Sequence, residues 1–281
     1  MSIRIIVDST GDLLPEIREQ VTVVPLTVSF GEEHFLDGVT IDHRTFYEKL
    51  IESDVLPITS QATPAAFEKV YREVKAAGDT AVVITLSSCL SGTYQSATIA
   101  LEGYEDCIFP VDSGTVAIGS GILTELALRL RGEGLTAAEI AERLKTERKN
   151  VRVIAMLDTL EYLHKGGRIS KTVAIAGGLL SIKPVMHIKN GKIELLGKAR
   201  GSKQGNNLLV KEIEAAGGVD FEKPILLGYT GLSDLMLQKY IADSASLWEA
   251  GTKELRTTQI GSVVGTHAGP GAVAAAFFKR T

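Results

Sequence analysis

Short apolar runs alternate with amphipathic stretches through the first half of the chain. Apolar positions recur at helical spacing after Thr63 and Pro64, which form an N-cap and a first helical position. Further helices are predicted from near Gly92, over about 116–131, and after the capping box formed by Thr136 and Glu139. Strands rich in β-branched residues are predicted at 3–7, 23–29, 81–86 and 108–111. This alternation is typical of βαβ units built around a parallel sheet.

The second half has a different pattern. Two apolar runs at 183–188 and 192–196 flank Asn190-Gly191, a pair that tolerates positive φ and so predicts a β-hairpin. Strands are also predicted at 151–157, 225–229, 254–259 and 261–265, and helices at 202–216 and 233–250. We therefore predict an α/β fold of two domains, with a parallel sheet in residues 1–150 and a mixed or antiparallel sheet in residues 151–281.

Composition narrows the possible function. The 281 residues are 44% hydrophobic and carry a formal charge of −4, which disfavours disorder and nucleic-acid binding. Cys89 and Cys107 are too few for a disulfide framework or a cysteine-based zinc site, and they suit a reducing compartment. The chain opens directly into a strand-like run without a signal sequence, and the most apolar late stretch, 173–185, is too short to cross a bilayer. We expect a soluble cytoplasmic protein.

Polar, turn-forming clusters mark the boundaries of the predicted elements at 8–12, 59–61, 87–93 and 112–115. Loops after parallel strands share one edge of the sheet, where ligands bind, so several hydroxyls are expected to converge. Helix caps and turns are the commoner explanation of any single cluster, and the repetition at successive strand ends is what favours a site. The run 87–93 ends at a predicted helix start and is a candidate cradle for a carboxylate or phosphate, although it lacks the lysine and spacing of a P-loop.

Two glycine-rich segments in the second half are candidate ligand loops. His267 lies among three glycines and a proline at 265–271, which predicts a turn where backbone approaches a ligand closely. Arg168 follows a short predicted helix with a glycine C-cap, and it suits either a salt bridge that locks the loop or a ligand contact. The small residues at 173–180, Gly177 and Gly178 among them, allow either tight packing or room for a ligand tail. The other four histidines show no metal-ligand spacing.

An ordered set of motifs resembles the DegV family of bacterial fatty-acid-binding proteins over essentially the whole chain. The motifs are Val7-Asp8-Ser9-Thr10, Thr59-Ser60-Gln61, Leu90 to Ala97, the Gly-Gly-Arg of Tyr162 to Ile169, Lys183-Pro184, Lys198 to Gly201, and Gly265 to Gly271. The resemblance implies two α/β domains that enclose a long-chain fatty acid between them. The sequence departs from the family pattern at Ala62, where the family often has proline after Thr-Ser-Gln.

The resemblance also implies roles for individual residues. Thr59, Ser91 and His267 match the positions that hold the ligand carboxylate, and Ser60, Gly92, Thr93 and Arg168 are further candidates for the loops around the ligand. In similar systems a separate ATP-dependent fatty acid kinase phosphorylates the bound acid to an acyl phosphate. Arg200 matches the basic position of the Lys-Ala-Arg motif and is a candidate for docking that kinase. The expected protein is a carrier without catalytic activity, with no metal or other cofactor and with transient contact to a membrane surface.

Two alternatives from other functional classes remain open at the level of sequence. In the first, Ser91 is the nucleophile of an acyl hydrolase and His267 is its base, although Ser91 lacks the Gly-x-Ser-x-Gly elbow and no acidic residue is evidently placed to orient His267. In the second, the strand-end loops bind a small phosphorylated metabolite.

Overall fold

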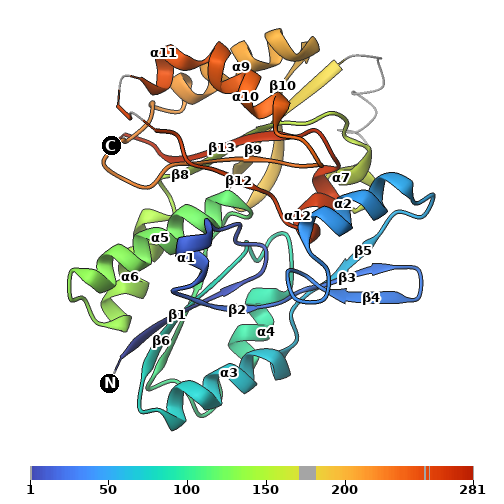
Figure 1. Cartoon of the computed structure of the whole chain (residues 1–281). Coiled ribbons are helices and arrows are strands. Elements are labelled where there is room, and N and C mark those ends of the chain that lie inside the picture. Colours follow the sequence, from blue (N-terminus) through green and yellow to red (C-terminus); the bar gives the residue numbers. More distant parts are fainter. Residues whose placement is uncertain (1, 171–181, 250, 253, 281) are drawn as a thin grey trace.

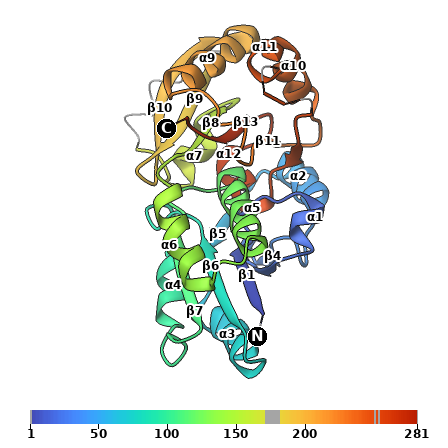
Figure 2. The same ribbon diagram turned by 90° about the vertical axis from the view of Figure 1, so that its left-hand side faces the viewer.

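The computed structural model describes residues 2–170, 182–249, 251–252 and 254–280. Two sheets lie one above the other, with helix α5 (Ile118–Gly132) between them (Figures 1 and 2). The predicted α/β architecture, with a parallel N-terminal sheet and a mixed C-terminal sheet, is confirmed. Gly177 and Gly178, named above as possible cavity residues, lie outside the described residues.

The N-terminal sheet is wholly parallel, in the order β2-β1-β6-β7. Its strands are β1 (Ile3–Asp8), β2 (Thr22–Val24), β6 (Thr80–Thr85) and β7 (Ile108–Asp112). Side chains alternate between its two buried faces: on β6, Val82 and Ile84 pack with α5 and α6 (Ala137–Glu147), whereas Ala81 and Val83 pack with α3 (Pro64–Ala76) and α4 (Thr93–Ile99). Because both faces are covered, its two central strands are almost continuously apolar.

A small antiparallel sheet beside the parallel one corrects the expectation of one strand at 23–29. The chain forms β2, turns away, and forms β3 (Thr27–Phe30), which pairs with β4 (Glu33–Leu36) and β5 (Ile58–Ser60). Helices α1 (Pro15–Arg18) and α2 (His43–Glu52) complete this region. The signal for the break was Pro25, which lies between β2 and β3 and has no backbone N–H to donate to a strand ladder.

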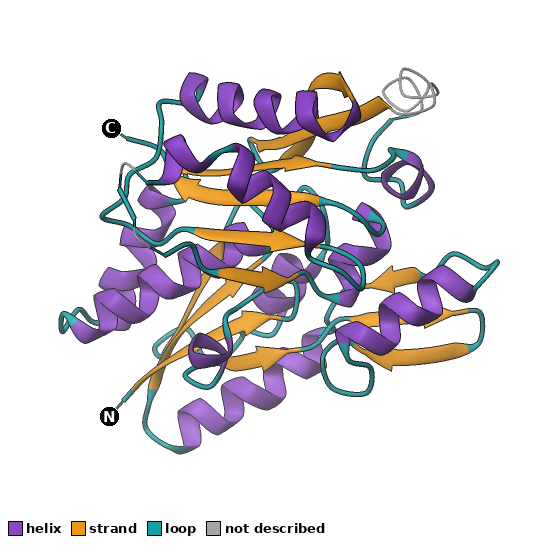
Figure 3. Cartoon of the chain, turned by 45° about the horizontal axis from the view of Figure 1, so that its top comes forward, coloured by secondary structure: helices purple, strands orange, loops and turns teal. Residues whose placement is uncertain are grey.

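The C-terminal sheet has the order β10-β9-β8-β13-β11-β12, and only the pair β11–β12 is parallel. Its strands are β8 (Val151–Met156), β9 (Ile182–Lys189), β10 (Lys192–Arg200), β11 (Leu226–Tyr229), β12 (Thr257–Gln259) and β13 (Val273–Phe278). The predicted hairpin is present, with φ of 50° at Asn190 and 77° at Gly191. Figure 3 shows the helices that cover the outer face of this sheet, which are α9 (Gly201–Ala215), α10 (Leu235–Asp243) and α11 (Ala245–Trp248).

Two predictions in this half were wrong. The expected single helix at 233–250 is divided at Ser244, whose hydroxyl donates to the Tyr240 carbonyl at 2.6 Å and accepts from Trp248 Nε1 at 2.9 Å. The expected strand at 261–265 is instead helix α12 (Ser262–Ala268), and His267 lies in its last turn rather than in a loop. Helix α7 (Glu161–Lys165) has the predicted glycine C-cap at Gly166.

Helix α5 packs against strands of both sheets, so one apolar cluster extends from Ile5 and Ile84 below to Leu226 and Ala274 above. The predicted division after Asn150 falls between α6 and β8 and stays a prediction, since the core is continuous across it.

Candidate functional site: a cavity between the two halves

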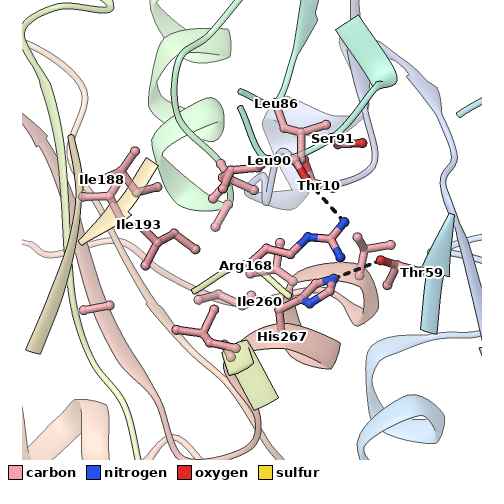
Figure 4. Close-up of a pocket in the computed structure, with 18 of the residues that line it drawn as sticks. Thr10, Thr59, Leu86, Leu90, Ser91, Arg168, Ile188, Ile193, Ile260 and His267 are labelled. Carbon is pink, nitrogen blue, oxygen red and sulfur yellow. Dashed lines mark hydrogen bonds between the residues drawn. The ribbon is translucent and has the colours of Figure 1, made fainter. Parts of the chain in front are cut away.

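A largely apolar cavity of about 130 Å³ lies between the two sheets. Figure 4 shows Thr59 and Ser91 at one end of it and Ile188 and Ile193 at the other. The walls between these ends come mostly from the C-terminal sheet and α12, through Val153, Ala155, Met186, Ala274, Val263 and Val264.

The cavity opens where the order of the parallel sheet reverses. Chain order runs from β1 outward to β2 on one side and to β6 on the other, so the loops after β1 and β6 separate at this point. Thr10, from the loop after β1, and Leu90 and Ser91, from the loop after β6, line the cavity. Thr10 is a lining residue that sequence reasoning placed only within a polar cluster.

Asp8 ties these two loops together. Its carboxylate accepts hydrogen bonds from Thr10 N at 2.9 Å, Thr10 Oγ1 at 2.6 Å and Leu86 N at 2.6 Å. Burial raises the pKa of Asp8 to about 6, against the opposing effect of these hydrogen bonds. The residue therefore acts as a buried crosslink between loops, and the loop hydroxyls, not its carboxylate, face the cavity.

Thr59 and His267 meet at the polar end, although 208 positions separate them in the chain. The Thr59 hydroxyl and His267 Nε2 lie 2.9 Å apart within hydrogen-bond distance (Figure 4). Thr59 is on the edge strand β5 and His267 is on α12, so the two halves of the chain each supply one partner.

His267 is held neutral in this position. Burial and the nearby Arg168 guanidinium lower its pKa from 6.5 to about 4. Its other ring nitrogen, Nδ1, is buried and has no hydrogen-bond partner among the described residues. A neutral imidazole donates through only one nitrogen, and the ring therefore has hydrogen-bonding capacity that the protein leaves unused.

Two glycines allow α7 to approach His267 and its helix. A Cβ on Gly166 would lie 2.2 Å from His267 Nδ1, and one on Gly269, where φ is 70°, would lie 2.3 Å from the Tyr162 ring. The glycine-rich sequence around His267 thus serves close packing, as well as the turn that follows α12.

Carboxylates from the N-terminal half hold the start of α12. Asp12 Oδ1 accepts from Gly261 N at 2.7 Å, and Asp37 Oδ1 accepts from Ser262 N at 3.1 Å. Acidic groups at a helix N-terminus satisfy its free N–H groups and interact favourably with its dipole. These contacts explain why 261–265 is helical despite its β-branched residues, and they place His267 opposite Thr59.

Ser91 is in the loop that leads into α4. Its hydroxyl lies 2.9 Å from Thr93 Oγ1 and accepts from Thr93 N at 3.3 Å. Gly92, the N-cap of α4, packs against Gln61, because a Cβ there would lie 2.1 Å from Gln61 Oε1. This contact brings the loops that carry Thr59 and Ser91 together, and both hydroxyls line the same cavity. The exposed Ser60 also contributes to the lining.

Arg168 both locks a loop and lines the cavity. Its guanidinium donates to the Gly166 carbonyl at 2.6 Å and to the Leu90 carbonyl at 3.3 Å, and it forms no ion pair with any described residue. Burial lowers its pKa. No Asp or Glu is among the described residues of the cavity lining, so this end of the cavity carries a positive charge that no side chain of the lining balances.

Arg200 lies outside the cavity. It ends β10 with an exposed side chain, and its backbone N–H donates to Gln204 Oε1 at 3.1 Å. The structure thus brings Thr59, Ser91, His267 and Arg168 to one cavity and leaves Arg200 on the surface.

Comparison with known proteins accords with this architecture. The model of the DegV family, described as uncharacterised proteins, matches residues 2–280. The chain belongs to the DegV family. A DegV domain-containing protein of Caldanaerobacter subterraneus is 33% identical, with 99% of each chain covered, and the DegV protein of Bacillus subtilis is 30% identical, with 97% of this chain and 98% of that protein covered.

Solved DegV structures share the whole fold and bind fatty acids. A fatty-acid-binding DegV family protein from Thermus thermophilus superposes with a TM-score of 0.88 at 29% identity and 100% coverage of both chains. A stearic-acid-binding protein from Eubacterium ventriosum gives a TM-score of 0.87 at 27% identity, with 99% of each chain covered. The DegV architecture of the present chain therefore matches that of lipid-binding relatives along its full length.

No helix among the described residues is long and apolar enough to span a bilayer. Likewise, none of their His, Cys, Asp and Glu side chains gather in threes as a metal ion would require.

Proposed function

We propose that this DegV protein binds a long-chain fatty acid in the cavity, with the carboxylate at Thr59, Ser91 and His267 and the acyl chain toward Ile188 and Ile193. The observation that carries the proposal is one cavity with hydroxyls, an imidazole and a guanidinium at one end and apolar side chains along the rest. Fatty acids bound by DegV relatives of the same fold support the same ligand class.

The acyl chain supplies the affinity. Each buried methylene is worth about 0.8 kcal/mol, so roughly fourteen of them contribute roughly 11 kcal/mol. Association costs about 4 to 15 kcal/mol, and the apolar term is therefore of the size needed to offset it.

The polar end supplies orientation. A carboxylate accepts hydrogen bonds from hydroxyls and brings the negative charge that the lining lacks beside Arg168. Hydrogen bonds to a charged group contribute about 1.5 to 3 kcal/mol each, which is enough to favour an acid over an ester of the same chain length.

We further propose that the protein is a carrier that presents the acid to a separate ATP-dependent fatty acid kinase, with Arg200 as a docking residue. The exposure of Arg200 and its place outside the cavity suit contact with a partner more than contact with the ligand. Transient contact with a membrane surface would supply the lipid.

The hydrolase alternative receives little support from the geometry. A triad needs the base bonded to the nucleophile and oriented by an acid. His267 Nε2 instead pairs with Thr59, Ser91 pairs with Thr93, and His267 Nδ1 has no partner in the described part of the chain.

Native mass spectrometry of the protein as purified tests the proposal. The expected result is an adduct with the mass of one long-chain fatty acid, which organic extraction removes and added fatty acid restores. A phosphate-containing adduct, or steady turnover of an acyl ester that Ser91→Ala abolishes, would replace the carrier function with one of the two alternatives.

A further inference from the structure

A second hollow of about 840 Å³ lies between the loops that follow β6 and β7 and the outer part of the C-terminal sheet. His187 and Ile188 on β9 line both this hollow and the lipid cavity. We call it the β9 cleft. It is far more polar than the cavity, and its charged lining residues are Arg148, Lys149, Arg152, Lys189, Asp112 and Glu212.

The charges that line the β9 cleft do not balance. Asp112 is fully engaged, since its carboxylate accepts from Ser88 Oγ at 2.7 Å and Gly114 N at 2.9 Å and pairs with Arg148 at 3.6 Å. Once that pair is set aside, Lys149, Arg152 and Lys189 face the single carboxylate of Glu212, and none of the three forms an ion pair with a described residue. The cleft is therefore cationic in a chain whose net charge is −4.

Arg152 is the anchor of this cluster. It is half-buried, and among the described residues only its NH1 has hydrogen-bond partners. NH1 donates to the carbonyls of Lys149 and Val151 at 2.8 Å each. Nε and NH2 have no partner among those residues. Burial also lowers the pKa of Arg152. An anionic ligand would supply what the protein does not.

We propose that the β9 cleft binds a small multivalent anion of the phosphate class. The free edge of a guanidinium matches two phosphate oxygens, and the two lysines add mobile point charges beside it. The position suits such a ligand as well, because the cleft adjoins the carboxyl ends of β6 and β7, an edge where α/β sheets bind ligands. This site is separate from the head-group end of the lipid cavity and does not depend on the lipid that the cavity holds.

Isothermal titration of the intact, lipid-loaded protein with pyrophosphate, inorganic phosphate and methyl phosphate tests the site. At about 0.15 M ionic strength, where surface charges are largely screened, we expect saturable one-site binding of pyrophosphate. If methyl phosphate binds at least as tightly as inorganic phosphate, the natural ligand is a phosphate monoester. If inorganic phosphate binds more tightly than methyl phosphate, the natural ligand is a free phosphate anion.

Three variants localise the binding. Lys149→Gln and Lys189→Gln change exposed side chains and keep the fold, and each should weaken pyrophosphate binding about tenfold. Arg152→Lys retains the charge but removes the paired N–H donors of the guanidinium, and it should weaken pyrophosphate binding by a similar factor. Lys69→Gln, an equal loss of charge on the exposed face of α3, is the matched control and should leave the affinity unchanged.

The proposal fails if pyrophosphate gives no saturable binding, or if Lys69→Gln weakens it as much as the cleft variants do. It also fails if tungstate soaked into crystals of the protein occupies another part of the surface and leaves the β9 cleft empty. Each of these results is independent of whether a fatty acid occupies the lipid cavity.

Discussion

A single methyl group added at Gly166 tests how the polar end of the cavity is built. Gly166 has ordinary helical dihedrals, with φ −74° and ψ −7°, so alanine is conformationally allowed there. The added Cβ would nevertheless lie 2.2 Å from Nδ1 and 2.8 Å from Cε1 of His267. Gly166→Ala therefore displaces the imidazole without straining its own backbone.

The expected cost follows from that contact. Overpacking a well-filled site costs about 1 to 3 kcal/mol. Moving the ring also breaks the 2.9 Å contact between Thr59 and His267, worth about 0.5 to 1.5 kcal/mol. Alanine recovers about 0.4 to 1 kcal/mol by restricting the unfolded chain. We expect Gly166→Ala to lower the free energy of unfolding by about 0.5 to 4 kcal/mol.

Urea unfolding of the lipid-free protein in a double-mutant cycle with His267→Ala measures the effect. Removing the imidazole removes the two nearest contacts of the new methyl group, so Gly166→Ala should then be neutral or stabilising by up to about 1 kcal/mol. The next nearest atom, the Tyr162 carbonyl oxygen at 3.0 Å, is present in both backgrounds. If Gly166→Ala destabilises both backgrounds equally, the packing of His267 against α7 is not what the glycine provides, and the reasoning is refuted.

Three further predictions concern the same site and its partner. Folding lowers the pKa of His267 from 6.5 to about 4, so between these pH values the unfolded chain binds a proton that the folded protein does not. The free energy of unfolding should therefore fall as pH decreases from 6.5 to about 4. In urea unfolding at each pH, His267→Gln should lose less of its free energy of unfolding over this range. Thr59→Val should weaken fatty acid binding about tenfold or more and change the affinity for the methyl ester of the same acid little. Displacement of a fluorescent fatty acid measures both affinities. Equal losses for the two ligands would contradict a head-group role for Thr59. Arg200→Glu should slow acyl phosphate formation by the kinase and leave lipid binding intact, whereas loss of both activities would indicate a structural role.

Local signals predicted the elements whose stabilising contacts are themselves local. The Asn190-Gly191 turn has the positive φ that its sequence demands, Thr63 caps α3 through a 3.2 Å bond from Ala66 N, and Thr136 and Glu139 form the expected capping box. In each case the residues that determine the conformation are neighbours in the chain.

Elements held by distant residues were predicted wrongly or not at all. Helix α12 was taken for a strand because its N-terminal caps, Asp12 and Asp37, are 249 and 225 positions away. The walls of the cavity were not predicted either, since residues such as Val153 and Ala274 carry the same apolar alternation as the solid core. Polar side chains after strands were informative because the shared edge of a parallel sheet brings them together.

The contacts between the two halves of the chain have a consequence for ligand exchange. The Thr59–His267 contact crosses from one half to the other, as does the 2.8 Å bond from Ser87 Oγ to the Gly191 carbonyl. A carboxylate bound between Thr59 and His267 would therefore be held from both sides at once, and separating the two halves would release it.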